Sequence, residues 1–275
     1  MLACFLDIDG ILVWAGDPLG FFLLLKKLSR YAKKRLKNYM ENSIGLLSKD
    51  MNNQVLKTLV GSHAHGLNTP TSDFDFRGVF IMPTEDFFRL PKVKIKTTDW
   101  VEDDVDNVSW ELGHFLDLAT HCNPSVLEVF LSPRVDKQTK DYDDGDRLRD
   151  LFPFVWNSKG VMESFIGYGL NQRKKYLEGK DGRPAKFAAA YIRSLYNGLE
   201  LLKTGTFTVK IADLPIGATV RRFKAGEASV GEVIQTCHDL EIQVRKAYED
   251  NPDKKTEIEP INDFLIEMRR KHFDV

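Results

Sequence analysis

The C-terminal half of the chain has the apolar periodicity of long helices. From about residue 150 onward, apolar positions recur every three to four residues, which places them on one face of a helix. Turn-forming Gly, Pro and Asn residues interrupt the pattern and divide it into separate segments. This half should therefore be mainly helical. The segments that we predict to be helices are 159–178, 184–204, 229–249 and 259–272.

Residues 54–133 have a different pattern, in which short apolar runs alternate with turn signals. Phe74 and Phe76 alternate with polar residues, and Pro83 ends that run, as expected for a strand. Ser109 is of the residue type that begins a helix. The elements predicted here are a strand, or a passage from helix to strand, at 55–60, a strand at 74–82, a helix from Ser109 to about 122 and a short helix at 126–131. We expect an α+β fold with a small mixed sheet followed by a helical region.

The first 50 residues differ in charge from the rest. They hold eight Lys and Arg residues against five Asp and Glu residues, whereas the whole chain has a net charge of −1. An apolar and then basic pattern at 21–40 predicts a helix. Met51 opens a segment that resembles the beginning of a protein chain. We therefore predict an appended segment at 1–50, a catalytic core at 51–135 and a helical domain at 136–275.

Composition limits the classes of function. The 39 basic and 40 acidic residues balance, which argues against a strongly basic nucleic-acid coat. The most apolar stretch, 2–25, carries Asp7, Asp9 and Asp17, so it is a poor membrane span. It is also a poor signal peptide, because no positively charged region precedes it. Three scattered cysteines suit neither a disulfide framework nor a thiolate metal site. We expect a soluble cytoplasmic protein with no membrane partner.

The stretch 61–79 carries the candidate chemistry. An apolar run ends in Gly61-Ser62, a small turn that lets backbone N–H groups approach an anion. Asp73 and Asp75 follow two residues apart, so on a strand both carboxylates project from one face. Carboxylate oxygens near a phosphate-binding turn suit Mg²⁺ bound between protein and a nucleoside triphosphate.

This pattern resembles the DNA polymerase β-like nucleotidyltransferase superfamily. The form Gly-Ser-x-Ala-x-Gly at 61–66, followed by Ser-Asp-x-Asp-x-Arg-Gly-Val at 72–79, is similar to a subgroup of predicted nucleotidyltransferases from bacteria and their phages. The similarity continues through 106–116 and 123–128 into the helical half. It covers about residues 51–255 and leaves the first 50 residues outside.

The resemblance implies a metal-dependent enzyme that moves a nucleoside monophosphate from an NTP, such as ATP, to an acceptor hydroxyl and releases pyrophosphate. It implies two Mg²⁺ ions, with Mn²⁺ as an alternative, held by Asp73, Asp75 and a third acid. The resemblance selects Asp106 for that role, ahead of Asp104. The other residues implied to bind nucleotide are Gly61, Ser62, Lys186 and Arg193. The acceptor stays open among RNA, protein and a small molecule, as does the oligomeric state.

Other interpretations remain open at this stage. A second interpretation is a nucleotidyltransferase fold that binds nucleotide, or acts as an antitoxin, without catalysis. Asp7 and Asp9 resemble the first motif of haloacid dehalogenase-type phosphatases, although few residues remain for that family's sheet. The basic stretch 26–37 suits either RNA phosphates or solvent. His63 and His65 lack further metal-ligand partners in the sequence, so we expect them near the phosphates.

Overall fold

The computed structural model describes residues 4–6, 12–14, 53–88, 90, 97–102, 105–136 and 142–273, with side chains from residue 53 onward except those of 97–106 and 142. The chain divides into two units, Met1–Asn52 and Asn53–Val275. In the first unit, β1 (Cys4–Leu6) pairs antiparallel with β2 (Leu12–Trp14). The helix predicted at 21–40, together with Asp7 and Asp9, lies outside the described residues.

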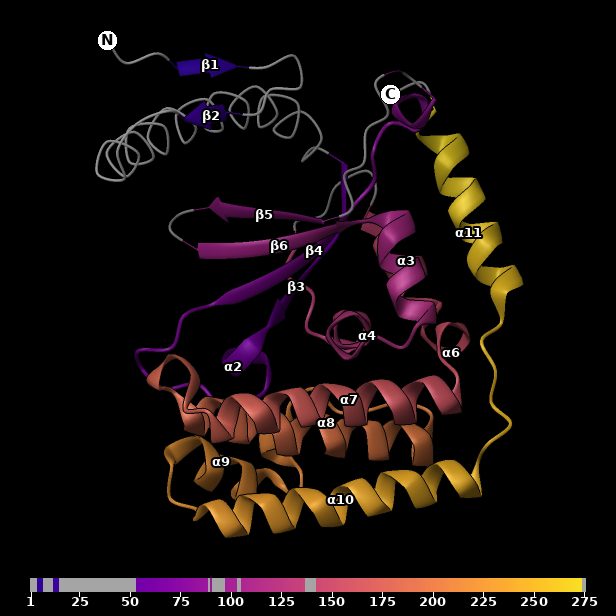
Figure 1. The fold of residues 1–275 in the computed structure, drawn as a ribbon. Helices are drawn as coiled ribbons and strands as arrows, with labels where there is room; N and C mark the ends of the chain where they lie inside the picture. Colours follow the sequence, from indigo (N-terminus) through magenta and orange to yellow (C-terminus); the bar gives the residue numbers. More distant parts are fainter. Residues whose placement is uncertain are drawn as a thin grey trace. The chain divides into compact units, whose positions relative to one another are not determined.

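The second unit is built on a mixed four-stranded sheet with the order β3-β4-β6-β5 (Figure 1). The strands are β3 (Gln54–Val60), β4 (Asp75–Phe80), β5 (Thr97–Glu102) and β6 (Val105–Glu111). Strands β3 and β4 pair antiparallel, as do β5 and β6, whereas β4 and β6 pair parallel. The predicted α+β class and the strand at 55–60 are confirmed.

Two predicted boundaries in this region are wrong. The strand predicted at 74–82 is shorter, because β4 begins at Asp75, and Asp73 lies in the connection before it. Ser109 does not begin a helix but lies within β6, and helix α3 (Leu112–Thr120) begins three residues later. Glu111 caps that helix, since its carboxylate accepts a hydrogen bond from the Gly113 N–H at 2.8 Å. Pairing with β4 and β5 on both sides overrides the local cap signal of Ser109.

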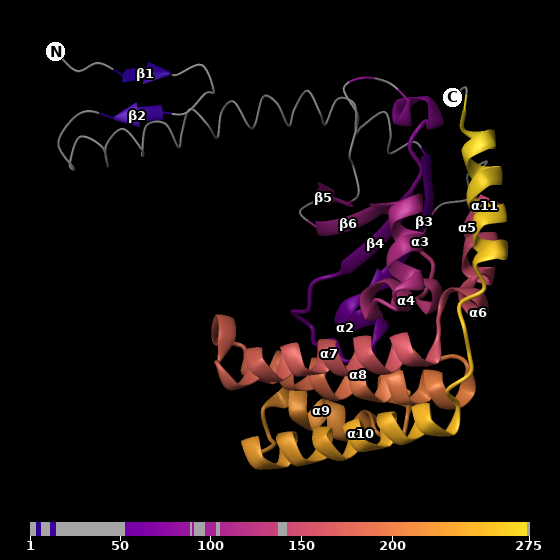
Figure 2. The ribbon, with the colours of Figure 1, turned by 45° about the vertical axis from the view of Figure 1, so that its right-hand side comes forward.

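The helical half follows the predicted periodicity closely. All four long helices are confirmed, with ends within two residues of those expected. The helices after α3 are α4 (Pro124–Leu131), α5 (Tyr142–Asp150), α6 (Phe152–Val155), α7 (Ser158–Leu177), α8 (Pro184–Thr204), α9 (Gly217–Ala225), α10 (Val230–Asp250) and α11 (Ile258–Lys271). One-turn helices are α2 (Gly61–Ala64), η2 (Thr84–Phe87), η3 (Lys180–Gly182) and η4 (Ile211–Asp213). Helices α7, α8 and α10 stack in rows beneath the sheet (Figures 1 and 2). None of the described helices is long and apolar enough to span a membrane.

A continuous row of aromatic side chains joins the sheet region to the helical region. Phe115 of α3 stacks on Phe130 of α4, with ring centres 5.0 Å apart, and Phe130 contacts Phe152 at 5.9 Å. Phe207 then bridges Phe152 and Phe165 of α7, at 6.2 and 6.1 Å. Each of these rings is at most 5% exposed, and each buried pair adds about 0.5–1.5 kcal/mol beyond area burial. Because α3 contacts β4, α4 contacts β3 and α8 packs on α7, this row links the sheet to the helices α7 and α8.

Candidate active site

A cleft of about 720 Å³ lies where β3, α2 and β4 meet the helices α7 and α8, with α4 and α9 also contributing. Six of the seven residues predicted for the site line this cleft: Gly61, Ser62, Asp73, Asp75, Lys186 and Arg193. Sequence positions more than 130 residues apart are thus brought to one place. The fold therefore gathers the predicted carboxylates and the predicted cations around a single space.

Asp75 lies directly against the turn that follows β3. It pairs with Val60 at the start of β4, and Gly61 has a φ of +68°. A Cβ atom at Gly61 would lie 2.1 Å from Oδ2 of Asp75, so only glycine allows this approach. Asp73, two residues earlier, is exposed at the cleft. Neither carboxylate makes a hydrogen bond or ion pair with any residue that the structure describes.

Asp106 occupies a position in β6 next to the start of β4. It pairs with Val101 of β5, and the following residue, Asn107, pairs with Phe76 of β4. Continued by one residue, this parallel register sets the backbone of Asp106 beside that of Asp75. The side chain of Asp106 is outside the described set, as is Asp104. Among the described side chains, no group of three His, Cys, Asp or Glu is arranged to hold a metal ion.

Basic side chains dominate the remainder of the cleft. Six cations line it: Arg77, Lys175, Arg183, Lys186, Arg193 and Lys224. The Nζ of Lys224 donates a hydrogen bond to the carbonyl of Leu67. Burial and then the nearby charge of Lys186 lower the pKa of Lys224. Concentrated positive charge of this kind favours a polyanionic ligand.

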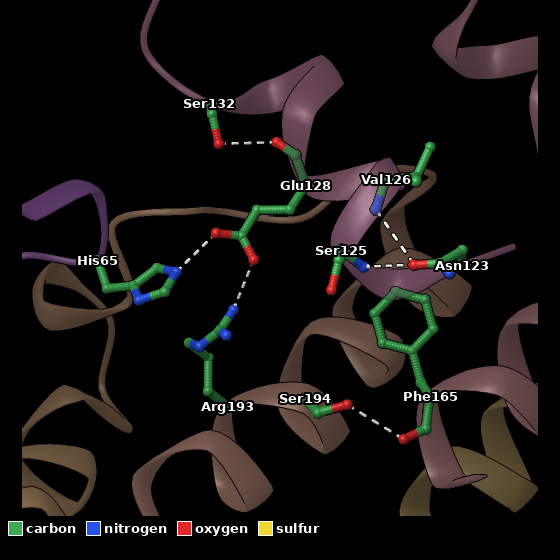
Figure 3. A network of polar contacts seen from close by, with 9 residues as sticks. All are labelled: His65, Asn123, Ser125, Val126, Glu128, Ser132, Phe165, Arg193 and Ser194. Atoms are coloured by element: carbon green, nitrogen blue, oxygen red, sulfur yellow. Dashed lines mark hydrogen bonds and ion pairs between the residues drawn. The ribbon is translucent and has the colours of Figure 1, made fainter. Parts of the chain in front are cut away.

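A buried network fixes one of these cations (Figure 3). The Nη1 of Arg193 on α8 donates to Oε2 of Glu128 on α4 at 2.8 Å. The other carboxylate oxygen lies 2.7 Å from Nε2 of His65, which follows α2. The three side chains are 15%, 10% and 9% exposed, respectively. Glu128 therefore connects the turn after β3 with the helix that carries Arg193.

The charges within this network follow from its contacts. Burial alone would raise the pKa of Glu128, but Arg193 and then His65 hold it well below its usual range. Burial and then the Arg193 charge lower the pKa of His65, although Glu128 acts in the opposite direction. At neutral pH an ionised Glu128 thus accepts hydrogen bonds from Arg193 and from the Nε2–H of a neutral His65.

Stability should fall on mild acidification because of His65. Below about pH 6.5 a histidine of the unfolded chain takes up a proton, while the folded chain keeps His65 neutral. The unfolded state then binds more protons, so the free energy of unfolding decreases as pH falls, by at most about 1.4 kcal/mol per pH unit. Urea unfolding between pH 8 and pH 5 measures this slope. The slope should be smaller in a His65→Gln variant. An equal slope in both proteins would contradict a lowered pKa of His65 in the folded chain.

His63 holds the segment that carries Asp73. Its Nε2 lies 3.0 Å from the carbonyl oxygen of Ser72, and its ring stacks on Phe74 at 3.9 Å with a 10° angle between the planes. These contacts fix the residues on both sides of Asp73. The histidines that we expected beside the phosphates are thus engaged with the protein, His63 with Ser72 and Phe74, and His65 with Glu128.

Sequence reasoning missed several residues of the cleft. Glu128 lies within the apolar run Val126–Phe130, and an acid in such a run is seldom buried without a partner. That signal could have marked it as part of a network. Lys224 and Gln172 carry no comparable signal, because only the folding of α9 and α7 brings them to the cleft.

Two curated proteins are similar to about half of this chain. The chain is 28% identical over 134 residues to an uncharacterized 38.9 kDa protein from the nrdC-mobD intergenic region of Enterobacteria phage T4, covering 44% of this chain and 38% of that protein. It is 25% identical over 127 residues to the uncharacterized protein YcgL of Bacillus subtilis, covering 46% of this chain and 48% of that protein. The chain thus spans less than half the length of these relatives.

A nucleotidyltransferase-like protein from Exiguobacterium sibiricum aligns with 80% of this chain and 74% of its own, at 13% identity and a TM-score of 0.24. The model of the RNA repair pathway DNA polymerase beta family matches residues 41–267, which is most of the chain. That match includes residues 41–50, which lie within the segment expected to be appended. The chain therefore belongs to this family of the polymerase β-like nucleotidyltransferase superfamily.

Proposed function

We propose that this chain transfers a nucleoside monophosphate from an NTP to an acceptor hydroxyl and releases pyrophosphate. The observation that carries the proposal is the composition of the cleft, in which Asp73 and Asp75 meet a group of lysines and arginines beside the Gly61 turn. Unpaired carboxylates and clustered cations in one space suit a triphosphate that binds together with divalent cations. The family match supports the same reaction class.

The protein's own part in this reaction is to bind and orient the donor. Lys186, Arg193 and Lys224 line the cleft and would hold phosphate oxygens, and the Glu128 contact fixes the direction of the Arg193 guanidinium. Gly61 and Ser62 lie where the triphosphate would approach the backbone. The acceptor oxygen attacks the α-phosphorus while the bond to pyrophosphate breaks, so positioning and charge stabilisation supply most of the rate enhancement.

The described residues fit a magnesium site in part. Asp73 and Asp75 offer hard oxygen ligands with no competing partner among the described residues, which is the donor type that Mg²⁺ and Mn²⁺ take. We propose Asp106 as the third carboxylate, on the register that sets its backbone beside Asp75, and as the acceptor of the proton from the attacking hydroxyl. When bound, the two ions would neutralise the charge of the phosphates and of the leaving group.

RNA is the acceptor that we propose first. The family description refers to an RNA repair pathway, and a terminal ribose supplies the hydroxyl that the reaction needs. We also keep the proposed organisation of the chain, with a segment at 1–50, a catalytic core at 51–135 and a helical region at 136–275. The last two parts share the row of aromatic rings, because Phe130 of one contacts Phe152 of the other.

A direct test uses the full chain with each α-labelled NTP and Mg²⁺. The acceptors are an RNA oligonucleotide with a free 3′ hydroxyl, the same RNA with a blocked 3′ end, a protein mixture and no acceptor. We expect the RNA with a free 3′ hydroxyl alone to gain the mass of one or more nucleotides. One pyrophosphate should be released for each nucleotide added. If nucleotide binds but no mixture releases pyrophosphate, the result would instead support a non-catalytic protein. If protein rather than RNA becomes labelled, the acceptor is a protein.

A further inference from the structure

Gln172 is a buried polar side chain without a hydrogen-bond partner among the residues that the structure describes. It lies on α7, is 4% exposed and lines the cleft. Its amide makes no hydrogen bond to any residue that the structure describes. Neither polar atom of this amide is among the fully enclosed, unpartnered atoms of the described side chains, so the amide reaches the open space of the cleft. The cleft itself is therefore where a partner for this amide has to come from.

The surroundings of Gln172 include aromatic and apolar side chains as well as a cation. Tyr168 lies one turn earlier on α7 and Lys175 about one turn later, so all three share one helix face. Phe187 and Ala190 of the neighbouring α8 line the same cleft, and the Nζ of Lys175 lies over the Phe187 ring, 5.7 Å from its centre. This part of the cleft thus combines the rings of Tyr168 and Phe187 and the small Ala190 side chain with the Lys175 ammonium and one neutral amide.

An amide discriminates between possible ligand groups. Its NH₂ donates while its oxygen accepts, so both are satisfied at once by a ligand with an acceptor and a donor side by side. The edge of a nucleobase has this arrangement, and its flat face suits aromatic and apolar walls. A phosphate offers acceptors only and would face the amide oxygen unfavourably.

We propose that Gln172 recognises the polar edge of the donor nucleobase and determines which NTP the enzyme prefers, with Tyr168 and Phe187 as the walls of the base site. This inference rests on the proposed function and adds the base-recognition site to it. A two-hydrogen-bond contact of this kind discriminates between bases by about 5- to 150-fold.

The experiment measures dissociation constants of the full chain for the four α,β-methylene nucleoside triphosphates and for inorganic tripolyphosphate. The variants are Gln172→Met, which is similar in shape, and Gln172→Leu. Gln235→Leu is the matched control, because Gln235 is exposed on α10, away from the cleft lining. We expect the wild type to prefer one base, the two Gln172 variants to lose about 5- to 150-fold of that preference, and tripolyphosphate affinity to stay unchanged.

Thermal unfolding without ligand separates recognition from folding. Removing an unpartnered amide should leave the melting temperature of both Gln172 variants at or above that of the wild type. Equal weakening of all four nucleotides and of tripolyphosphate would overturn the inference, as would unchanged discrimination or a wild type without preference. A wild type that binds no nucleotide would overturn the proposed function itself.

Discussion

Replacing Asp75 with Asn is expected to lower nucleotidyl transfer by about 100- to 1,000-fold, the usual effect of removing one group that stabilises transition-state charge. The amide keeps the shape of the side chain against Gly61, but it removes the negative charge beside the cations of the cleft. The measurement is kcat/KM for pyrophosphate release over a range of Mg²⁺ concentrations. The loss should persist at saturating Mg²⁺ if the carboxylate is a ligand whose charge the reaction needs.

Thermal unfolding provides a second readout for the same variant. Asp73 and Asp75 lie two residues apart without cationic partners among the described residues, so Mg²⁺ should raise the melting temperature of the wild type. Asp75→Asn should shrink that shift without lowering the melting temperature in the absence of metal. Asp263→Asn, on the exposed side of α11, is the control and should change neither quantity. Full activity and an unchanged Mg²⁺ shift in Asp75→Asn would contradict the site.

The fold could be predicted from sequence where the signal is local. The helices α7, α8, α10 and α11 each carry several turns of amphipathic periodicity between clear breakers, so their ends were placed within two residues. Strand β6 was missed because its identity depends on pairing with β4 and β5, which a local pattern around Ser109 does not contain. Pairing with these two strands determines that this segment is a strand.

The candidate site also contains both residues that lie close together in the sequence and residues that come from distant elements. Gly61, Ser62, Asp73 and Asp75 lie within fifteen residues and form a recognisable pattern, so the sequence identified them together. Residues such as Gln172 come from separate helices, and their role depends on which face of each helix meets the cleft. The sequence therefore marks these four residues as one motif, whereas the cleft residues that the helices contribute form no such motif.

Glu128→Leu should cost about 3–5 kcal/mol of unfolding free energy, the usual loss when one partner of a buried ion pair is removed. The change leaves the Arg193 guanidinium without its carboxylate at a side chain only 15% exposed, and it also deprives His65 of its hydrogen bond. Urea unfolding at pH 7.5 gives the free energy. The matched control is Glu241→Leu, which removes the more exposed 2.8 Å pair with Arg245 on α10 and should cost about 0.5 kcal/mol or less.

The double variant Glu128→Leu/Arg193→Leu tests whether the unfolding free energy that Glu128→Leu loses is due to the unpaired charge of Arg193. Replacing a whole buried pair by apolar side chains is often close to neutral, so the double variant should recover most of the stability that Glu128→Leu loses. Glu128→Gln should also lose less, because an amide can accept from Arg193 and donate to the Nε2 of His65 in its other tautomer. Additive losses in the double variant would show that Glu128 does not hold Arg193. A large non-additive recovery would show that the two side chains are energetically coupled, as expected where a carboxylate on α4 holds the Arg193 guanidinium in a direct ion pair.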